Sequence, residues 1–376
     1  AEDHLGLKGI DTLEQLAEVK RTVVEIATDT AVLNADDPHT LRMAAYTKAK
    51  HVCYVTMDPA HDLVREHIRA GGRAIALEAG VNGQMITIYD RGAHIPLLWT
   101  HLIPATLEGR ATFNVQNAMF AAAMAFAMGV RLEDIRHGLR TFDTTFFQAP
   151  GRLNVYDEHP FKVLFDYGHN AHAVGALCDL VNRMKPAGRR ICVLSAPGDR
   201  RDEDIHAIAT VAASAAFDHY ICRRDDPLRG RGDDDVPRML MEGLKAGGID
   251  DSRITMIVDE QQAIEAALRM ARTGDLLLIF ADALARGWKQ ITNFRPDDSV
   301  LVVPAPRAAR AVPRQEVLEV APADDLAPAK ATPVADMQTP VMSPVETPPA
   351  RWSTASDDLV LVRDERGVIL APEASD

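Results

Sequence analysis

No apolar run in the sequence is long enough to cross a membrane. None approaches the roughly 18 apolar residues that a spanning helix needs, and the chain opens on an acidic stretch without the pattern of a signal peptide. We therefore expect a cytoplasmic protein with no membrane partner. Cysteine is also scarce: Cys53, Cys178, Cys192 and Cys222 form no CxxC pair, and three of them lie in apolar runs. This favours reduced core residues.

Positive charge is under-represented. The 41 Lys and Arg residues are outnumbered by 54 Asp and Glu residues, which gives a formal net charge of -13. Such a charge argues against a nucleic-acid partner, because the phosphates would repel it, but it allows a nucleotide in one local pocket. With 376 residues, 47% of them hydrophobic, the chain is long enough for two domains with substantial cores.

The first part of the chain alternates between predicted helices and strands. A helical pattern begins near Leu13, and apolar runs at 31–34, 51–56 and 73–77 predict strands, with helices after Asp37-Pro38 and over 59–70. The Gly-Val-Asn-Gly sequence at 80–83 is a turn signal, and residues 84–99 alternate as in antiparallel strands. An Ala- and Met-rich helix follows and is expected to end at Gly129.

From Phe146 the pattern becomes a regular βαβ series. Predicted strands lie at 163–166, 191–195, 219–222, 255–258 and 276–280. They are nearly continuous apolar runs, which is typical of a parallel sheet covered by helices on both faces. We therefore expect a doubly wound domain here. Polar loops at 166–170, 196–204 and 223–235 should meet at one rim of its sheet, where open α/β sheets bind ligands.

The composition changes after Phe294. A dozen of the 22 prolines lie from Pro296 onward, among Ala, Val, Thr and Asp. Such a segment buries too little apolar surface to offset the entropy lost on ordering, so we expect a flexible tail over 298–376. A short hairpin around Glu365-Arg366-Gly367 is a possible exception that could dock elsewhere.

Two groups of polar residues are candidates for ligand binding. Asp166, His169 and Asn170 directly follow a predicted strand, although an ordinary strand-to-helix turn is an alternative explanation. Asn114 and Asn117 are three residues apart at the start of a predicted helix and share one face. They could cap free N–H groups or hydrogen-bond to the edge of a base.

Eight motifs along residues 1–294 resemble those of the ATP-dependent Mur ligase superfamily, which includes the peptidoglycan Mur ligases and folylpolyglutamate synthetase. In chain order they are DHLG, AEVK, NADDP, FNVQN, PGR, DYGHN, PGDRRDED and DDPLRGR. Several are most similar to the ligase portion of the cyanophycin synthetase family. The resemblance implies an α/β fold with a partial central ATPase domain over 1–145, a Rossmann-like doubly wound domain over 146–297, and the tail over 298–376.

The resemblance also implies ATP and Mg²⁺ as cofactors, and it suggests roles for residues of this chain. Metal binding would involve His4 and Lys20, with the lysine modified to a carbamate. Catalysis would involve Lys20, Asp166 and His169. Nucleotide binding is implied for Asn114, Asn117, Arg152, Asp166 and His169. Substrate binding is implied for Asp199, Arg200, Asp225, Asp226, Arg229 and Arg231. Each assignment has a structural alternative. His4 could be a surface histidine near a chain end, and Lys20 an exposed lysine on a helix. The charged residues of the loop at 223–235 could be a solvated run of charges.

The implied reaction forms an amide bond. Arginine would be added to the β-carboxyl of a poly-aspartate (cyanophycin) primer through an acyl phosphate, in an enzyme expected to be a homo-oligomer. No G-x-x-x-x-G-K-[ST] loop occurs in the sequence, so we expect a fragment that is inactive alone. Another Mur-type amino-acid ligase, such as a folylpolyglutamate or peptidoglycan-precursor enzyme, is an alternative, as is a non-catalytic scaffold that recruits partners through the Pro-rich tail.

Overall fold

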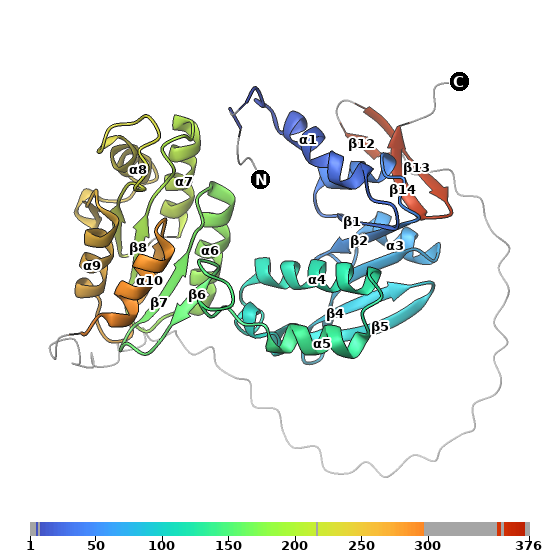
Figure 1. Ribbon diagram of the computed structural model, residues 1–376, viewed down its shortest axis with the longest axis horizontal. Helices are drawn as coiled ribbons and strands as arrows, with labels where there is room; N and C mark the ends of the chain where they lie inside the picture. Colours follow the sequence, from blue (N-terminus) through green and yellow to red (C-terminus); the bar gives the residue numbers. More distant parts are fainter. Residues whose placement is uncertain (1–4, 7, 216, 297–351, 355–356, 373–376) are drawn as a thin grey trace, which may run out of the picture.

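Residues 5–6, 8–215, 217–296, 352–354 and 357–372 are described by a computed structural model, and their strands form three sheets (Figure 1). A five-stranded sheet lies in the first part of the chain, a six-stranded sheet follows, and a three-stranded sheet lies near the C-terminus. No helix in the described part of the chain is both long and apolar enough to cross a membrane. All four cysteines are free and buried, as predicted.

The first sheet combines a parallel half with an antiparallel half. Its order is β1 (Thr30–Asn34), β2 (His51–Thr56), β3 (Arg73–Gly80), β4 (Gly83–Asp90), β5 (Ala93–Trp99). The first three strands run parallel, and β3, β4 and β5 are antiparallel neighbours. The predicted turn at 80–83 is confirmed, because Gly80 pairs with Gly83, whose φ of 116° suits glycine.

Five helices accompany this sheet, which together with them is called the first body, residues 13–141. They are α1 (Leu13–Glu25), α2 (Pro38–Arg42), α3 (Asp62–Arg69), α4 (Thr112–Ala127) and α5 (Leu132–Thr141). A capping box between Thr12 and Gln15 begins α1, and the Asp37 side chain caps α2. The apolar side of α4 packs on β1, β2 and β3, where Met119 and Ile75 are fully buried.

The second sheet is doubly wound, as predicted. Its order is β10 (Ile254–Met256), β9 (His219–Cys222), β8 (Arg190–Leu194), β11 (Leu276–Phe280), β7 (Lys162–Asp166), β6 (Asn154–Tyr156). All neighbouring strands run parallel except β6, which is antiparallel to β7. Strands β7, β8, β9 and β11 therefore end at the same rim of the sheet.

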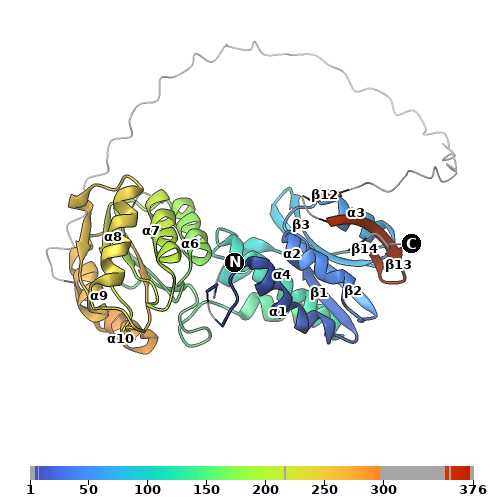
Figure 2. The same cartoon turned by 90° about the horizontal axis from the view of Figure 1, so that it is seen from above.

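Helices cover both faces of this second body, residues 154–293, as Figure 2 shows. On one face lie α6 (Ala171–Met184), α7 (Asp202–Ser214) and α8 (Asp235–Ala246). On the other lie α9 (Glu260–Met270) and α10 (Leu284–Asn293). Burial on both faces explains why these strands read as nearly continuous apolar runs.

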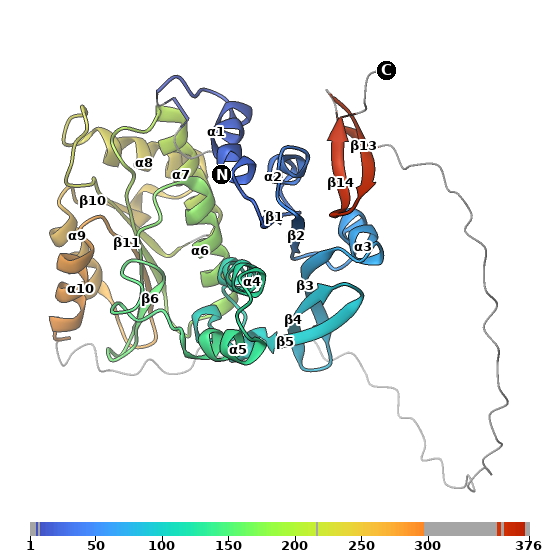
Figure 3. The ribbon, with the colours of Figure 1, turned by 45° about the vertical axis from the view of Figure 1, so that its right-hand side comes forward.

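The third sheet lies near the C-terminus and contains the hairpin that the sequence set apart from the predicted tail. Strands β12 (Trp352–Thr354), β13 (Asp357–Asp364) and β14 (Gly367–Pro372) are antiparallel, so the hairpin around Glu365-Arg366-Gly367 is confirmed. It packs against α3 and α2 of the first body, where side chains such as Leu370 are buried (Figure 3). The predicted flexible tail at 298–351 lies outside the described residues.

Candidate functional site

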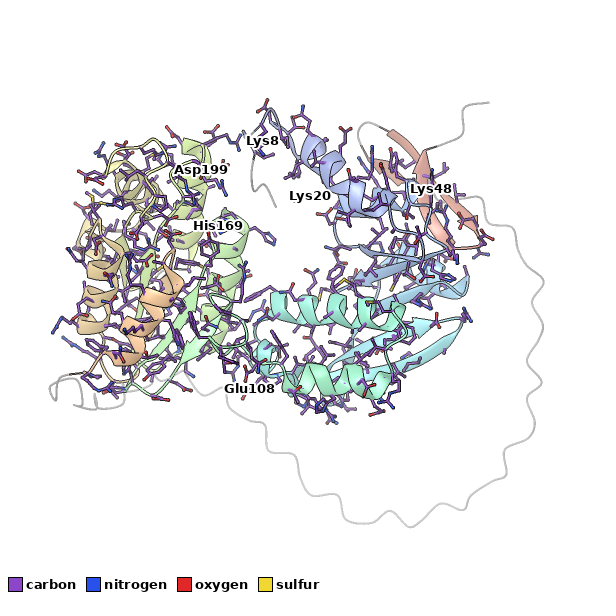
Figure 4. The ribbon with its side chains drawn as sticks, viewed as in Figure 1. Lys8, Lys20, Lys48, Glu108, His169 and Asp199 are labelled. Atoms are coloured by element: carbon purple, nitrogen blue, oxygen red, sulfur yellow. The ribbon has the colours of Figure 1, made fainter. Side chains whose placement is uncertain are left out.

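The rim of the second sheet carries most of the predicted site residues. Asp166 is the last residue of β7, and the loops after β8 and β9 contain Asp199 and Asp225 respectively. Figure 4 shows His169 and Asp199 on the side of the second body that faces helix α1 of the first body. The sequence thus predicted correctly that these polar loops belong to strands ending on one rim.

Asp166 is a buried carboxylate that holds two backbone segments together. It is 8% exposed, and its oxygens accept hydrogen bonds from the N–H groups of Leu153 at 2.7 Å and Gly168 at 2.6 Å. Burial raises the pKa of this carboxyl, although both hydrogen bonds oppose the rise. Gly151 and Leu153 have φ angles of 68° and 50°, so the loop between them is bent through the left-handed region. Asp166 therefore positions the loop that carries Arg152.

His169 and Asn170 form the turn between β7 and α6. The Asn170 side chain accepts a hydrogen bond from the Ala173 N–H at 2.9 Å and caps α6, so it takes the role of an ordinary turn residue. His169 is partly buried, and its Nδ1 lies 3.0 Å from the carbonyl oxygen of Tyr167. That contact favours the tautomer in which Nδ1–H donates, which leaves Nε2 as an acceptor.

Three predicted nucleotide-binding residues line one cavity of about 540 Å³ between α4, α5 and the segment that connects the two bodies. Asn114 donates from Nδ2 to the carbonyl oxygen of Ala105 at 2.7 Å, and Asn117 donates to Asn114 Oδ1 at 3.1 Å. Neither asparagine caps the helix, because Ala111 occupies the N-cap position. Arg152 reaches the same cavity from the connecting segment. Most of the other lining residues are alanine, leucine, isoleucine and similar apolar types.

Two of the predicted substrate-binding loops are joined by ion pairs. Asp199 accepts from Arg229 at 2.9 Å and from Arg200 at 3.3 Å. Burial acts to raise the pKa of Asp199, but the hydrogen bond from Arg229 and the two arginine charges lower it below its ordinary value. Arg231 donates to Gly198 O at 2.8 Å and to Asp202 at 2.8 Å. The loops after β8 and β9 therefore form one charged surface.

Asp225 and Asp226, two of the predicted substrate-binding residues, each bind an arginine of the chain itself. Asp225 is buried and lies 3.3 Å from Arg223 Nη1, and Asp226 lies 2.6 Å from Arg286 Nη2. Burial raises the pKa of Asp225, and the Arg223 guanidinium limits that rise. The Asp226 pair is exposed, with 42% of the aspartate side chain accessible. Of the two carboxylates, only Asp226 is accessible to a ligand.

Sequence reasoning missed the arginines that organise this rim. Arg223 is fully buried and also pairs with Glu260, whose Oε2 lies 2.9 Å from Arg223 Nη2. Glu260 in turn accepts a hydrogen bond from the Asp282 N–H at 2.8 Å, which ties the loop after β11 to α9. The signal that could have found Arg223 is its place directly after the apolar run of β9, where a cation must find partners if it is buried.

The metal-binding prediction remains untested. Lys20 lies exposed on α1, and Figure 4 shows it across from His169 and Asp199 rather than beside them. His4 lies outside the described residues. No group of three or more His, Cys, Asp and Glu side chains within the described part of the chain could hold a metal ion. A carbamate on Lys20 would require desolvation of its amine, which an exposed helix position does not supply.

Comparison with known proteins gives a family match and a set of similar curated proteins. The family described as Mur ligase, glutamate ligase domain, matches residues 151–283. The cyanophycin synthetase of Crocosphaera subtropica is 36% identical over 79% of this chain and 33% of its own length. That of Trichormus variabilis is 40% identical over 77% of this chain and 32% of its own length. The chain thus spans about a third of the length of these curated relatives.

More distant relatives share the fold. A UDP-N-acetylmuramoyl-L-alanyl-D-glutamate–2,6-diaminopimelate ligase of Solibacter usitatus is 27% identical over 74% of this chain and 51% of its own length. The structure of a bifunctional folylpolyglutamate synthase/dihydrofolate synthase from Yersinia pestis, complexed with AMPPNP and Mn ion, has a TM-score of 0.54 at 20% identity. It covers 78% of this chain and 59% of that one. The α/β fold predicted from the motifs is confirmed.

Proposed function

We propose that this chain, which belongs to the Mur ligase superfamily, is the ligase part of a longer ATP-dependent enzyme that joins arginine to aspartate side chains of an acidic polymer. The identity of 35–40% to cyanophycin synthetases supports this assignment. The observation that carries it is that Asn114 and Asn117 of α4 and Arg152 of the connecting segment line one cavity beside the rim.

The cavity suits the base and ribose of ATP. Its apolar walls would enclose an aromatic ring, and the amide of Asn117 can hydrogen-bond to the edge of a base, while Asn114 is held in place through Ala105. Arg152, exposed on a loop that Asp166 fixes, is suited to phosphate oxygens through its planar guanidinium. Mg²⁺ belongs to the proposal as the ion that accompanies the phosphates, with oxygen ligands preferred.

The charged surface of the rim is the proposed site for the incoming amino acid. Asp226 is the accessible carboxylate, and a substrate guanidinium would replace Arg286 as its partner. Arg229 and Arg231 belong to the same loop and supply positive charge suited to the α-carboxylate of an amino acid. ATP would transfer its terminal phosphoryl group to the β-carboxylate of the acceptor, which leaves ADP and an acyl phosphate. The arginine α-amino group would then attack the acyl carbon, forming the amide and releasing inorganic phosphate and a proton. A homo-oligomeric, cytoplasmic enzyme is part of the same proposal.

Calorimetric titration of the 376-residue chain with L-arginine tests the amino-acid assignment. We expect binding of arginine, and Asp226→Asn should weaken it by about tenfold, the effect of losing one charge-assisted hydrogen bond. In parallel, a fluorescent ATP analogue should bind wild type and lose affinity in Asn117→Ala. Preference for diaminopimelate over arginine would favour a peptidoglycan-type ligase. If the chain binds neither the nucleotide nor any amino acid, a non-catalytic scaffold protein is the better explanation.

A further inference from the structure

Helices α9 and α10 pack side by side (Figure 2). Their side chains line a groove of about 650 Å³. Its lining includes four basic side chains and one acidic side chain: Arg269, Arg286, Lys289 and Arg295 against Glu265. The whole chain carries a formal net charge of -13, so the groove has the opposite sign to the molecule. Concentration of one sign of charge in a concave surface attracts ligands of the other sign.

Two of these positive charges are available to a ligand. Arg269 pairs with Glu265 at 2.7 Å, and Arg286 pairs with Asp226 at 2.6 Å. Lys289 and Arg295 are exposed, and neither lies within ion-pair distance of a carboxylate among the described residues. Among the described residues, the groove therefore has two positive charges that no carboxylate within ion-pair distance neutralises.

The groove is continuous with the rim of the second sheet. Both helices begin at that rim, α9 at Glu260 and α10 at Leu284, and Arg286 belongs to the groove and to the Asp226 ion pair at once. From Arg286 the groove runs along α10 past Lys289 toward Arg295. From Arg286 to the end of α10 at Asn293 there are eight residues of helix, about 12 Å, which matches about three to four residues of an extended peptide.

The polar lining fits a polypeptide better than a polyphosphate. Besides its basic residues, the groove is lined by the exposed side-chain amides of Gln261 and Asn293. An amide both donates and accepts hydrogen bonds, as a peptide backbone does, whereas a phosphate chain offers acceptors alone. The net charge of the molecule further disfavours nucleic acid.

We propose that the groove between α9 and α10 binds an acidic polypeptide in extended form and directs it to the rim. The carboxylates of the polypeptide meet Lys289 and Arg295, and its end reaches the region of Arg286 and Asp226. The identification of this polypeptide as the poly-aspartate acceptor rests on the proposed function.

Fluorescence anisotropy with a labelled oligo-aspartate peptide tests the groove. A peptide of about ten residues is longer than the groove, and it is titrated with the 376-residue chain at low salt. Lys289→Glu combined with Arg295→Glu should weaken binding at least about tenfold, since two attractive charges become repulsive. Glu265→Gln should strengthen it about two- to fivefold by removing the acidic lining residue. Raising the salt to about 0.5 M should weaken wild-type binding strongly, because the interaction is screened.

The matched control changes the same amount of charge on the other face of the sheet. Arg238→Glu combined with Lys245→Glu alters two exposed basic residues of α8, each already near a carboxylate. We expect this pair to weaken binding less than about threefold. Equal weakening by the two double variants, or no binding of the peptide to wild type, would overturn the proposal.

Arginine binding in the same variants separates this inference from the proposed function. The α9–α10 variants should bind L-arginine as wild type does, because Asp226 and the loop after β9 are unchanged. Peptide binding that depends on Lys289 and Arg295, without any arginine binding, would support the groove and contradict the proposed function. Normal arginine binding, with peptide binding insensitive to both double variants, would contradict the groove alone.

Discussion

The carboxylate of Asp166 accepts a hydrogen bond from the backbone N–H of Leu153, 2.7 Å away, and so joins the end of β7 to the loop that carries Arg152. The same carboxylate accepts from the N–H of Gly168. A residue expected from its motif to contact nucleotide directly has both oxygens engaged by the backbone. Its contribution to ligand binding would then be made through the position of Arg152.

Replacement of Asp166 should therefore reduce both stability and nucleotide affinity. Asp166→Ala leaves buried N–H groups without acceptors, and we expect a loss of about 1–3 kcal/mol in the free energy of unfolding, measured by urea denaturation. Asp157→Asn is the control, because that side chain is 69% exposed, and it should change stability by less than about 0.5 kcal/mol. Similar values for the two variants would contradict the positioning role.

The neighbouring carboxylates Asp225 and Asp226 should respond differently to the same substitution. Asp225→Asn leaves the buried Arg223 with one partner fewer and should cost about 3–5 kcal/mol in unfolding free energy. Asp226→Asn removes an exposed pair with Arg286 and should cost less than about 1 kcal/mol. Thermal and urea unfolding check both values. If Asp226→Asn lowers the unfolding free energy more than Asp225→Asn does, burial does not determine how much each ion pair contributes to stability.

Docking of the C-terminal sheet should weaken in acid because of His67. Its Nδ1 accepts from the Val368 N–H at 3.0 Å, and its Nε2 lies 3.2 Å from the carbonyl oxygen of Val52, so the neutral ring is the form that fits. Burial lowers the pKa of His67 below its ordinary value, and the hydrogen bonds to backbone carbonyls and the charge of Asp364 oppose this. The His67 imidazole therefore binds a proton more tightly in the unfolded state than in the folded state. Its contribution to the stability of the docked sheet is fully present above about pH 6.5 and is lost as the pH falls below that value.

Hydrogen exchange of β14 between about pH 5 and 7.5, corrected for the intrinsic exchange rate, measures this effect. Protection should fall on the acid side in wild type. His67→Asn keeps an acceptor near the position of Nδ1 but cannot titrate in this range, so its protection should depend less on pH. Replacing the exposed His137 with Asn serves as the control and should leave the wild-type profile unchanged. An unchanged profile in His67→Asn would contradict this explanation.

Removal of the C-terminal sheet should destabilise the first body. Leu359, Ile369 and Leu370 are buried against it, and burial of each such side chain contributes about 1.5–3 kcal/mol as an upper estimate. Truncation after residue 296 should therefore increase hydrogen exchange in α3 and β2 more than in β7 and β8 of the second body. Truncation after residue 372 retains the sheet and should have no such effect. Equal exchange in both truncated chains would mean that the sheet adds no stability.

Much of the fold was determined by the sequence alone. The spacing of apolar residues predicts the strands of both large sheets, since a strand covered on both faces needs an apolar run and a half-exposed strand needs alternation. The order of the motifs was sufficient to indicate the superfamily. Helix α5 and strand β6 were not predicted, because β6 is only three residues long and α5 is a short helix in which only Ile135 is buried.

Only the tertiary structure decided which groups meet. The hairpin at 357–372 has an apolar side in the sequence, but its binding surface on α3 lies about 300 residues away along the chain. Likewise the sequence shows Arg223 and Asp226 after β9, while their partners Glu260 of α9 and Arg286 of α10 become visible only when these segments pack together. Local patterns are set by the period of a helix or strand, whereas ion pairs and burial depend on contacts between distant segments.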